Sequence, residues 1–467
     1  MNKDIMLRHD EAFEESLEKI FEWFDDKMYF KIKAELLKYN EADIAEMFEE
    51  FLEDEDLRSR TIVVYRLLPK DVSVDVFSYL PSDDQLKIVE GITDDELTYI
   101  IQELDFDDKI DILEELPANL VDKILEAAPK AERKLINTFL NYPDDCAGSI
   151  MTPDYISLMK EWTVRQALDY IREVGMDSET IYTCYVKDGG RKLLGIVSLR
   201  NLVIADDNVR IMDIMHTDYV CVNVYDDQEE VSEEFKKYGF LAMPVVDREH
   251  RLVGIITVDD ILDVIEVENT EDIERMAGII DLEQTDEEYL DKSVLKHARN
   301  RLPWLLFMMC MAMVTGAIIS SFEDMLSAVI VLVSYMPLLM GTGGNTGAQA
   351  STLIIRGLSL GEVELEDAGR VVWKEIRISL CVGLVLSSVN FLKILLIDRQ
   401  PFSIALTVCL AMLVIVLFAK VIGGMVPMLA EKIGVDPALM ANPVIASSTD
   451  MISVLVYFCM AKLILGI

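Results

Sequence analysis

Asp450 is the only acid in the last long apolar stretch of the chain, between the segments VIASST and MISVLVYF. The stretch is long enough to cross a bilayer, and Asp450 lies near its middle. A charge at the centre of a bilayer costs at least about 2.5 to 3.5 kcal/mol, so it is tolerated where it faces water, a partner or a cation. The first hypothesis is therefore that the chain handles ions in a membrane.

The residues around Asp450, GVDPALMANPVIASSTDMIS at 434–453, are unusually polar for a membrane span. Asn442 stands near the start, Ala446 lies one turn before Asp450, and three hydroxyl residues directly precede it. No Cys or His lies among them, which favours a hard ion that prefers oxygen ligands. One Asp from each of two symmetric subunits would suit hydrated Mg²⁺, because Mg²⁺ keeps several waters and uses few carboxylates.

A second segment, PLLMGTGGNTGAQASTLIIR at 337–356, has four glycines among seven consecutive residues. In one interpretation, the small residues serve only to let membrane helices pack closely. The other is a pore-lining segment that is locally unwound or tightly packed, for which a uniform helix is not expected. Asn345 and Gln349 are four residues apart, so on a helix both would face one side.

A third group consists of carboxylates in a segment with helical character before the apolar region. These five acids lie within 13 residues: Asp260, Asp263, Glu268, Glu271 and Asp272. A solvated linker helix usually interleaves Lys or Arg with its acids, but no basic residue lies between Asp259 and Arg275. Both a solvated linker and a cation-binding helix are compatible with this pattern.

The elements that position these residues include about five segments of the ~20 residues needed to cross hydrocarbon. They lie near 302–321, 325–356, 376–397, 402–430 and 438–463. Basic residues before the first segment place its start in the cytoplasm, and an odd number of spans then places the C-terminus outside. A multi-pass domain in a lipid bilayer is predicted.

The part before Leu302 carries nearly all of the net charge of −40, since only 11 of 83 acids and 9 of 43 bases follow that position. Such an excess of carboxylates disfavours nucleic acid and accumulates cations. The seven cysteines are scattered and the four histidines lack zinc-ligand spacing, so we expect a reduced environment and no zinc site. The first residues lack an apolar signal core, which predicts that this part is cytoplasmic.

Residues 68–140 contain an internal repeat with a period of twelve. One phase of the repeat is Asp71, Asp83, Asp95, Asp107 and Asn119. Because Asp and Asn are favourable N-caps, each repeat is predicted to be a two-turn helix capped at this position and followed by a tight turn. Stacked units of this kind predict a helical array over roughly 10–140. Capping does not explain the additional acids, which include Asp108 and Asp111.

Two similar modules follow the repeats. SIMTPDYISL at 149–158 is echoed by DIMHTDYVCV at 213–222, and LLGIVSLRN by LVGIITVDD. Each copy predicts the order strand, helix, strand, strand, helix, and the pair resembles a tandem CBS pair. In CBS modules the terminal Asp of this motif can hold a nucleotide ribose. Asp260 stands there in the second copy, which predicts an adenine nucleotide as a ligand. The first copy departs from the motif, because it has Asn201 at this position.

The complete order resembles the MgtE family of magnesium channels and transporters. The motifs GTGGNTG at 341–347 and GVDPA at 434–438, followed by NP and a membrane Asp, carry the resemblance. It implies a multi-domain fold: an all-α helical-repeat N domain, an α/β tandem CBS pair, a connecting plug helix and an all-α transmembrane domain of five helices. The implied boundaries are 1–140, 141–200 and 201–265 for the two CBS modules, 266–297 for the plug, and 298–467.

The resemblance also implies roles for the membrane residues. Asp450 is then the magnesium selectivity residue at the axis of a homodimer, and Ala446 contributes its backbone carbonyl. Gly341 and Asn345 line the pore, and Asn442 lies near the cytoplasmic gate.

The five linker acids match the family pattern for regulatory Mg²⁺ ligands. Asp436 would be the membrane-side acid that faces the plug, and Asp107 and Asp111 the partners in the N domain. Arg200 and Phe240 match nucleotide-contacting positions.

Two departures from the family pattern affect these expectations. Gly239 stands where the family can have an acidic ligand, so we expect one regulatory site to be absent. Lys420 lies in the fourth span at a position that is more usually neutral. Its ammonium group is expected to reach the interface, pair with an acid or lose its charge through desolvation.

The sequence therefore predicts a non-enzymatic, homodimeric Mg²⁺ channel in a bacterial inner membrane. Mg²⁺ would be both the transported and the regulatory ion, and ATP would modulate the channel. Two alternatives stay open. An exchanger that couples Mg²⁺ to Na⁺ or H⁺ would use Asp450, with Lys420 as a titrating partner. A membrane-anchored metal and nucleotide sensor would need no water path.

Overall fold

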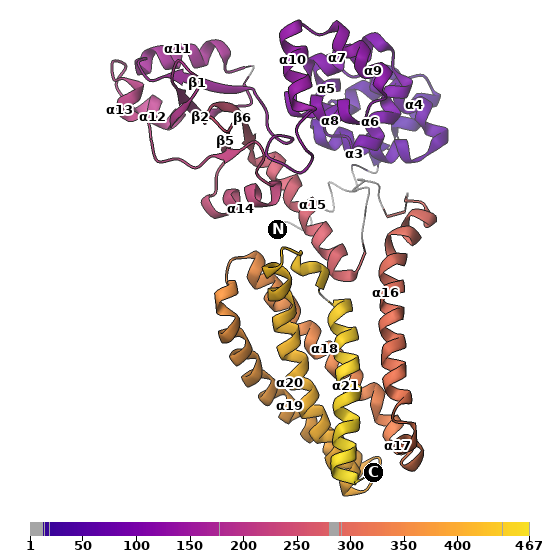
Figure 1. Ribbon diagram of the computed structural model, residues 1–467. Helices are drawn as coiled ribbons and strands as arrows, with labels where there is room; N and C mark the ends of the chain where they lie inside the picture. The colour runs from indigo at the N-terminus through magenta and orange to yellow at the C-terminus, as the bar shows by residue number, and fades with distance from the viewer. Residues whose placement is uncertain are drawn as a thin grey trace. The chain divides into compact units, whose positions relative to one another are not determined.

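The computed structural model describes residues 13–279, 289–290, 292–440 and 442–466, apart from Glu14, Glu18 and Asp177. The chain forms two compact units, Met1–Glu266 and Val267–Ile467. The first holds the helical repeats and two small sheets, and the second holds the long apolar helices (Figure 1).

Short helices build the first part of unit one. They are α2 (Tyr29–Leu36), α3 (Glu41–Glu53), α4 (Glu55–Tyr65), α5 (Lys70–Ser78), α6 (Ser82–Gly91), α7 (Asp94–Glu103), α8 (Phe106–Glu115), α9 (Ala118–Ala127) and α10 (Lys130–Phe139). From α5 to α10 a helix starts every twelve residues, as the repeat predicts. From α2 to α9, helices two places apart along the chain contact each other. The repeats therefore stack in a helical array with a shared apolar core.

The predicted N-caps of these helices are wrong by two residues. Pro69, Pro81 and Pro117 occupy the N-cap positions, and Asp71 and Asp83 lie inside the first turn. These helices and α10 begin directly after proline, because its fixed φ, −59° at Pro69, suits a helix entry, whereas α7 follows Thr93 and α8 follows Asp105. The acids in the first turn favour the positive end of the helix dipole. The helices are consequently 9 or 10 residues long, nearer three turns than two.

Two modules with the predicted order strand, helix, strand, strand, helix complete unit one. The first contains β1 (Tyr155–Met159), α11 (Val164–Val174), β2 (Thr180–Lys187), β3 (Leu193–Ser198) and α12 (Leu199–Ile204). After α13 (Ile211–Ile214) come β4 (Val222–Asn223), α14 (Gln228–Tyr238), β5 (Ala242–Val246), β6 (Leu252–Thr257) and α15 (Val258–Ala277). In each sheet the first strand is parallel to the second, and the second is antiparallel to the third.

The closing helix of the second module also supplies the start of the connecting segment. α15 is a single helix of 20 residues, so it begins before the boundary expected at residue 266 and passes from unit one into unit two. Gly278, with a φ of +73°, follows it. The rest of the expected plug at 280–288 and residue 291 lie outside the described residues.

Unit two consists of long helices with three short helical elements between them. They are α16 (Val294–Ser320), α17 (Glu323–Ala328), α18 (Val331–Ser359), η1 (Leu365–Asp367), α19 (Ala368–Leu396), α20 (Phe402–Lys432), η2 (Pro437–Met440) and α21 (Asn442–Leu465). Four described segments are long and apolar enough to cross a membrane: Val294–Ser320, Leu365–Leu396, Phe402–Lys432 and Pro443–Leu465. α18, which contains the glycine-rich motif, is of similar length but is not one of these four segments. The count of five spans therefore stays a prediction.

The glycine-rich motif is helical, and local unwinding is not observed. α18 continues through residues 341–347 and packs on α20 and α21. A Cβ atom on Gly423 of α20 would overlap the carbonyl oxygen of Gly347, and one on Gly343 would lie 2.6 Å from the Ser453 hydroxyl. The motif therefore lets three backbones approach closely, which is the packing interpretation of its small residues.

Candidate functional site

A group of carboxylates from three elements meets inside unit one. Asp107 and Asp108 lie in the first turn of α8, Glu179 directly precedes β2, and Asp260 lies in the first turn of α15. Asp260 is held in place because the hydroxyl of Thr257 donates a hydrogen bond to its Oδ2 over 2.6 Å. Helical repeats and both CBS-like modules thus contribute to this acid cluster, which we define as Asp107, Asp108, Glu179 and Asp260.

Burial and mutual repulsion disfavour the charged forms of this acid cluster. Burial, followed by the charges of Asp105 and Asp259, raises the pKa of Asp107 to about 6. Burial and the neighbouring acids raise the pKa of Asp260 to about 7 and those of Asp108 and Glu179 to about 8. The cluster therefore needs protons or a cation to be stable in this arrangement.

A hydrated cation fits this cluster better than a closed metal cage. Oδ1 of Asp107 is buried without a hydrogen-bond partner, so the cluster contains an unsatisfied acceptor. Among the described residues, no three acidic, Cys or His side chains gather closely enough to hold a bare metal ion. Mg²⁺ that keeps most of its waters can bridge carboxylates that do not themselves form a cage.

The sequence predicted part of the acid cluster. It named Asp107 and Asp260, and it noted Asp108 as an acid that capping did not explain. Glu179 was missed, because a single acid before a strand carries no periodic signal. Asp111 contributes to the raised pKa of Asp108. Asp263 is largely exposed on α15, and the partial burial of its carboxyl group, followed by the charges of Glu266 and Asp259, raises its pKa.

A second group lies in unit two, where α15 meets the segment between α20 and α21. Nη1 of Arg275 donates to Oδ2 of Asp436 over 2.8 Å, and Nη2 of the same side chain donates to Glu271. Oδ1 of Asp436 also accepts the backbone N–H of Ala438 over 2.7 Å. Burial and the charge of Asp436 raise the pKa of Asp272. Asp436 was predicted to face the plug helix, and it contacts Arg275 of α15, a residue for which the sequence predicted no role.

Glu268 is the remaining linker acid of the predicted set. It is half-buried on α15, three residues before Glu271. It lies on the part of α15 that belongs to unit two.

The predicted pore residues lie on α18 and α21. Gly341, Asn345 and Gln349 follow one another at intervals of one turn and are all exposed, so they form one face of α18. Asp450 is half-buried on α21, and within the described residues no hydrogen bond or ion pair engages its carboxylate. Ala446 lies one turn earlier, and its carbonyl accepts a hydrogen bond from Thr449 over 2.9 Å. The side chain of Asn442 lies outside the described residues.

Lys420 has a buried acidic partner. Its ammonium nitrogen lies 3.8 Å from Oε2 of Glu375 on α19. Of the three outcomes expected for Lys420, the structure therefore shows pairing with an acid.

The predicted nucleotide-contacting residues lie on separate elements. Arg200 is exposed on α12, while the ring of Phe240 stacks on Tyr238 with 5.2 Å between centroids. Asn201 lies 3.1 Å from Nε2 of His216. Gly239 ends α14 with a φ of +65°, a conformation that glycine adopts readily.

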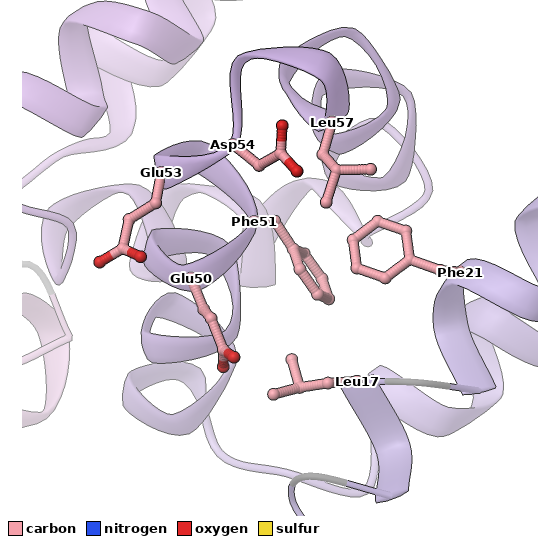
Figure 2. A pocket seen from close by; sticks show the side chains of 7 residues that line it. All are labelled: Leu17, Phe21, Glu50, Phe51, Glu53, Asp54 and Leu57. Atoms are coloured by element: carbon pink, nitrogen blue, oxygen red, sulfur yellow. The ribbon is translucent and has the colours of Figure 1, made fainter.

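A separate pocket in unit one is lined by apolar and acidic residues (Figure 2). Phe21 and Phe51 meet edge to face with 4.4 Å between centroids, and Leu17 and Leu57 complete the apolar lining. Asp54 already accepts the backbone N–H of Asp56 as the N-cap of α4. These residues serve the local fold and are not part of the acid cluster.

Comparisons with known proteins cover most of the chain. A family model described as a divalent cation transporter matches residues 336–460, one described as the MgtE intracellular N domain matches 39–145, and the CBS domain model matches 147–208 and 211–267.

Relatives that match over most of their length carry the same name. The magnesium transporter MgtE of Thermus thermophilus is 40% identical over 342 residues, which cover 73% of this chain and 74% of that protein. MgtE of Enterococcus faecalis is 35% identical over 70% of this chain and 71% of its own length. A solved cytosolic domain of the Mg²⁺ channel MgtE in complex with ATP is 34% identical and covers 53% of this chain and 98% of that structure, with a TM-score of 0.49.

Proposed function

This chain belongs to the MgtE family of magnesium transporters, and we propose that it is a Mg²⁺-selective channel for magnesium uptake that cytosolic Mg²⁺ closes. The prediction of a transporter rather than an enzyme is confirmed by these relatives.

The acid cluster of unit one is the observation that carries the regulatory part. At low Mg²⁺, repulsion among Asp107, Glu179 and Asp260 favours separation of the helical repeats from the CBS pair. At high Mg²⁺, bound ions relieve the repulsion and favour the packed arrangement. Mg²⁺ shifts this equilibrium because it binds the packed arrangement more tightly, and the shift is limited by that difference in affinity.

The connecting helix α15 offers a route from the cluster to the pore. Asp260 at one end of α15 belongs to the acid cluster, and Glu271 near the other end is joined through Arg275 to Asp436, close to the start of α21. A change in the position of α15 would therefore act on the segment that leads into α21. We propose that Asp263, Glu268 and Asp272 are further Mg²⁺ contacts along this helix.

The conduction part of the proposal rests on Asp450. A half-buried carboxylate with no protein partner among the described residues is suited to a cation, to water or to a second subunit. We propose a homodimer in which Asp450 of both subunits faces the axis, with the Ala446 carbonyl and the exposed α18 face that includes Asn345 lining the path. Asn442 is proposed for the cytoplasmic end.

The remaining proposals concern topology and nucleotide. Five spans, including α18, would place the N-terminal unit in the cytoplasm of a bacterial cell and the C-terminus outside the inner membrane. Binding of ATP by the CBS pair at Arg200 and Phe240 stays a prediction. Asn201 stands where CBS modules usually have an acid, and its side chain lies 3.1 Å from Nε2 of His216. We therefore expect weak binding of the nucleotide.

Flux through purified protein in liposomes tests the proposed function. A Mg²⁺ gradient alone, without gradients of Na⁺ or H⁺, should drive Mg²⁺ entry and give single-channel currents. Flux that appears only with a Na⁺ or H⁺ gradient would support the exchanger instead. No flux under any gradient from correctly folded protein would support a metal and nucleotide sensor. Repeating the measurement with Mn²⁺, Co²⁺ and Ni²⁺, and with ATP, defines selectivity and nucleotide dependence.

A further inference from the structure

Glu375 on α19 and Lys420 on α20 form a buried ion pair within the apolar helices of unit two. Each residue is only 5% exposed, and the charged atoms are 3.8 Å apart. Oε2 of Glu375, the atom nearest the ammonium group, is buried and has no hydrogen-bond partner. The pair is therefore held by charge attraction more than by a hydrogen bond.

The pair lies directly behind the glycine-rich part of α18. Lys420 belongs to the turn of α20 that contacts α18, because a Cβ on Gly347 would lie 3.2 Å from the Ala419 carbonyl oxygen and Gly423 packs on Gly347. The other side of this turn contacts α19, where a Cβ on Gly424 would lie 3.5 Å from Cγ of Glu375. The ammonium group of Lys420 lies beside Glu375 on α19, so its distance from the far side of α18 is at least one helix diameter, roughly 10 Å.

Neither charge is favourable without the other. A buried ion whose partner is removed keeps its desolvation cost and loses its compensating attraction. The same helix turn contacts α18, whose exposed face carries Asn345. A lone ammonium group at this place would repel a cation passing on the far side of α18, and it would repel a divalent ion twice as strongly as a monovalent one.

We propose that Glu375 is a positioning and charge-neutralising residue for Mg²⁺ conduction: it cancels the positive charge of Lys420 behind the pore-lining helix. The proposal rests on the proposed function, because it takes α18 as the wall of the ion path. It distinguishes an electrostatic role of the pair from simple cross-linking of α19 to α20, since the two roles predict different responses to the loss of either charge.

Mg²⁺ flux into liposomes by full-length E375Q, K420M and E375Q/K420M tests this proposal. E375Q leaves Lys420 unpaired, and flux should fall by about fivefold or more, given a unit charge roughly 10 Å from a divalent ion. K420M leaves only a negative charge, and flux should not fall. The double variant should recover to within about twofold of the unsubstituted protein, and E375D, which keeps the charge, should stay close to it.

Elution profile and melting temperature of each variant separate misfolding from loss of conduction. If E375Q does not fold, the charge-swapped variant E375K/K420E replaces it, and flux within about threefold of the unsubstituted protein is expected. Equal flux in E375Q and the unsubstituted protein, equal losses in both single variants, or a folded double variant as poor as E375Q would overturn the proposal. Absence of flux in the unsubstituted protein would instead contradict the proposed function.

Discussion

Asp450 and Asp436 are two aspartates of unit two whose carboxylates have different surroundings. Asp436 is engaged by Arg275 and by the N–H of Ala438, whereas Asp450 has no such partner in the described part of the chain. The sequence predicted the importance of both acids. It could not predict that Arg275, 161 positions away in the chain, neutralises Asp436, because contact between distant segments leaves no mark on spacing.

Replacement of Asp450 by Asn tests its role at the residue scale. Mg²⁺ flux should fall by about tenfold or more, because a unit charge 4 Å from another attracts it by about 1 kcal/mol even in water, and a dimer would present two carboxylates to a divalent ion. Liposome flux measures the change. Asp324→Asn, at an exposed acid in α17, is the matched control and should leave flux unchanged. Equal flux in both variants would remove Asp450 from the ion path.

Replacement of Arg275 by Gln tests the contact between α15 and Asp436. The side chains of Arg275 and Asp436 are partly exposed, so the ion pair stabilises the contact by less than about 1 kcal/mol, and flux at low Mg²⁺ should rise by two- to fivefold. Arg275→Lys keeps the positive charge and is the control. A decrease in flux for Arg275→Gln at low Mg²⁺ would argue against a closing role for this contact.

At the scale of elements, periodic patterns were predicted well and contacts between helices were not. The twelve-residue repeat and the order of both CBS modules follow from recurring residue types. The N-caps were misplaced because proline and Asp recur with the same period, and proline directly precedes the first residue of α5, α6, α9 and α10. For α18 the sequence left close packing and local unwinding both open, and close backbone contact with α20 and α21 favours the continuous helix.

Gly423→Ala tests the close approach of α18 and α20. The added Cβ would overlap the Gly347 carbonyl oxygen, so we expect a loss of stability of about 1–3 kcal/mol and a lower melting temperature in detergent. Gly316→Ala on α16 is the control, since a Cβ there meets nothing within 4 Å. Similar melting temperatures for the two variants would mean that the backbones do not approach as closely as described.

The acid cluster predicts how the stability of unit one depends on pH. Without Mg²⁺, the folded unit keeps protons on Asp107, Asp260 and Asp108, whose pKa values are about 6, 7 and 8, after the unfolded chain has released them. The folded state therefore binds more protons between about pH 4 and 8, and the free energy of unfolding falls as the pH rises through this range.

Melting temperatures of the full-length protein at constant ionic strength measure this dependence. The transition of unit one should shift downward from pH 5 to pH 8 without Mg²⁺, and Mg²⁺ should restore most of the loss at pH 8. Asp108→Asn should weaken the shift, because the amide cannot release a proton. A transition that is independent of pH would contradict the raised pKa values.

At the scale of the whole molecule, the distribution of charge is the feature most readily interpreted from sequence. Nearly all of the charge of −40 precedes the apolar helices, and part of it is concentrated where three elements of unit one meet. The sequence predicted cation dependence from this excess. It could not assign Glu179 to the cluster, or Glu375 to Lys420, because each partner comes from an element distant in the chain.

The dependence of channel current on cytosolic Mg²⁺ tests the central claim most directly. Patches containing the full-length protein should conduct at micromolar cytosolic Mg²⁺ and close in the millimolar range. The double variant Asp107→Asn/Asp260→Asn should lose most of this dependence while its open-channel current is unchanged, because it removes charge from the acid cluster and leaves Asp450 intact. Mg²⁺-dependent closure that is the same in both proteins would contradict the proposal that this cluster senses cytosolic magnesium.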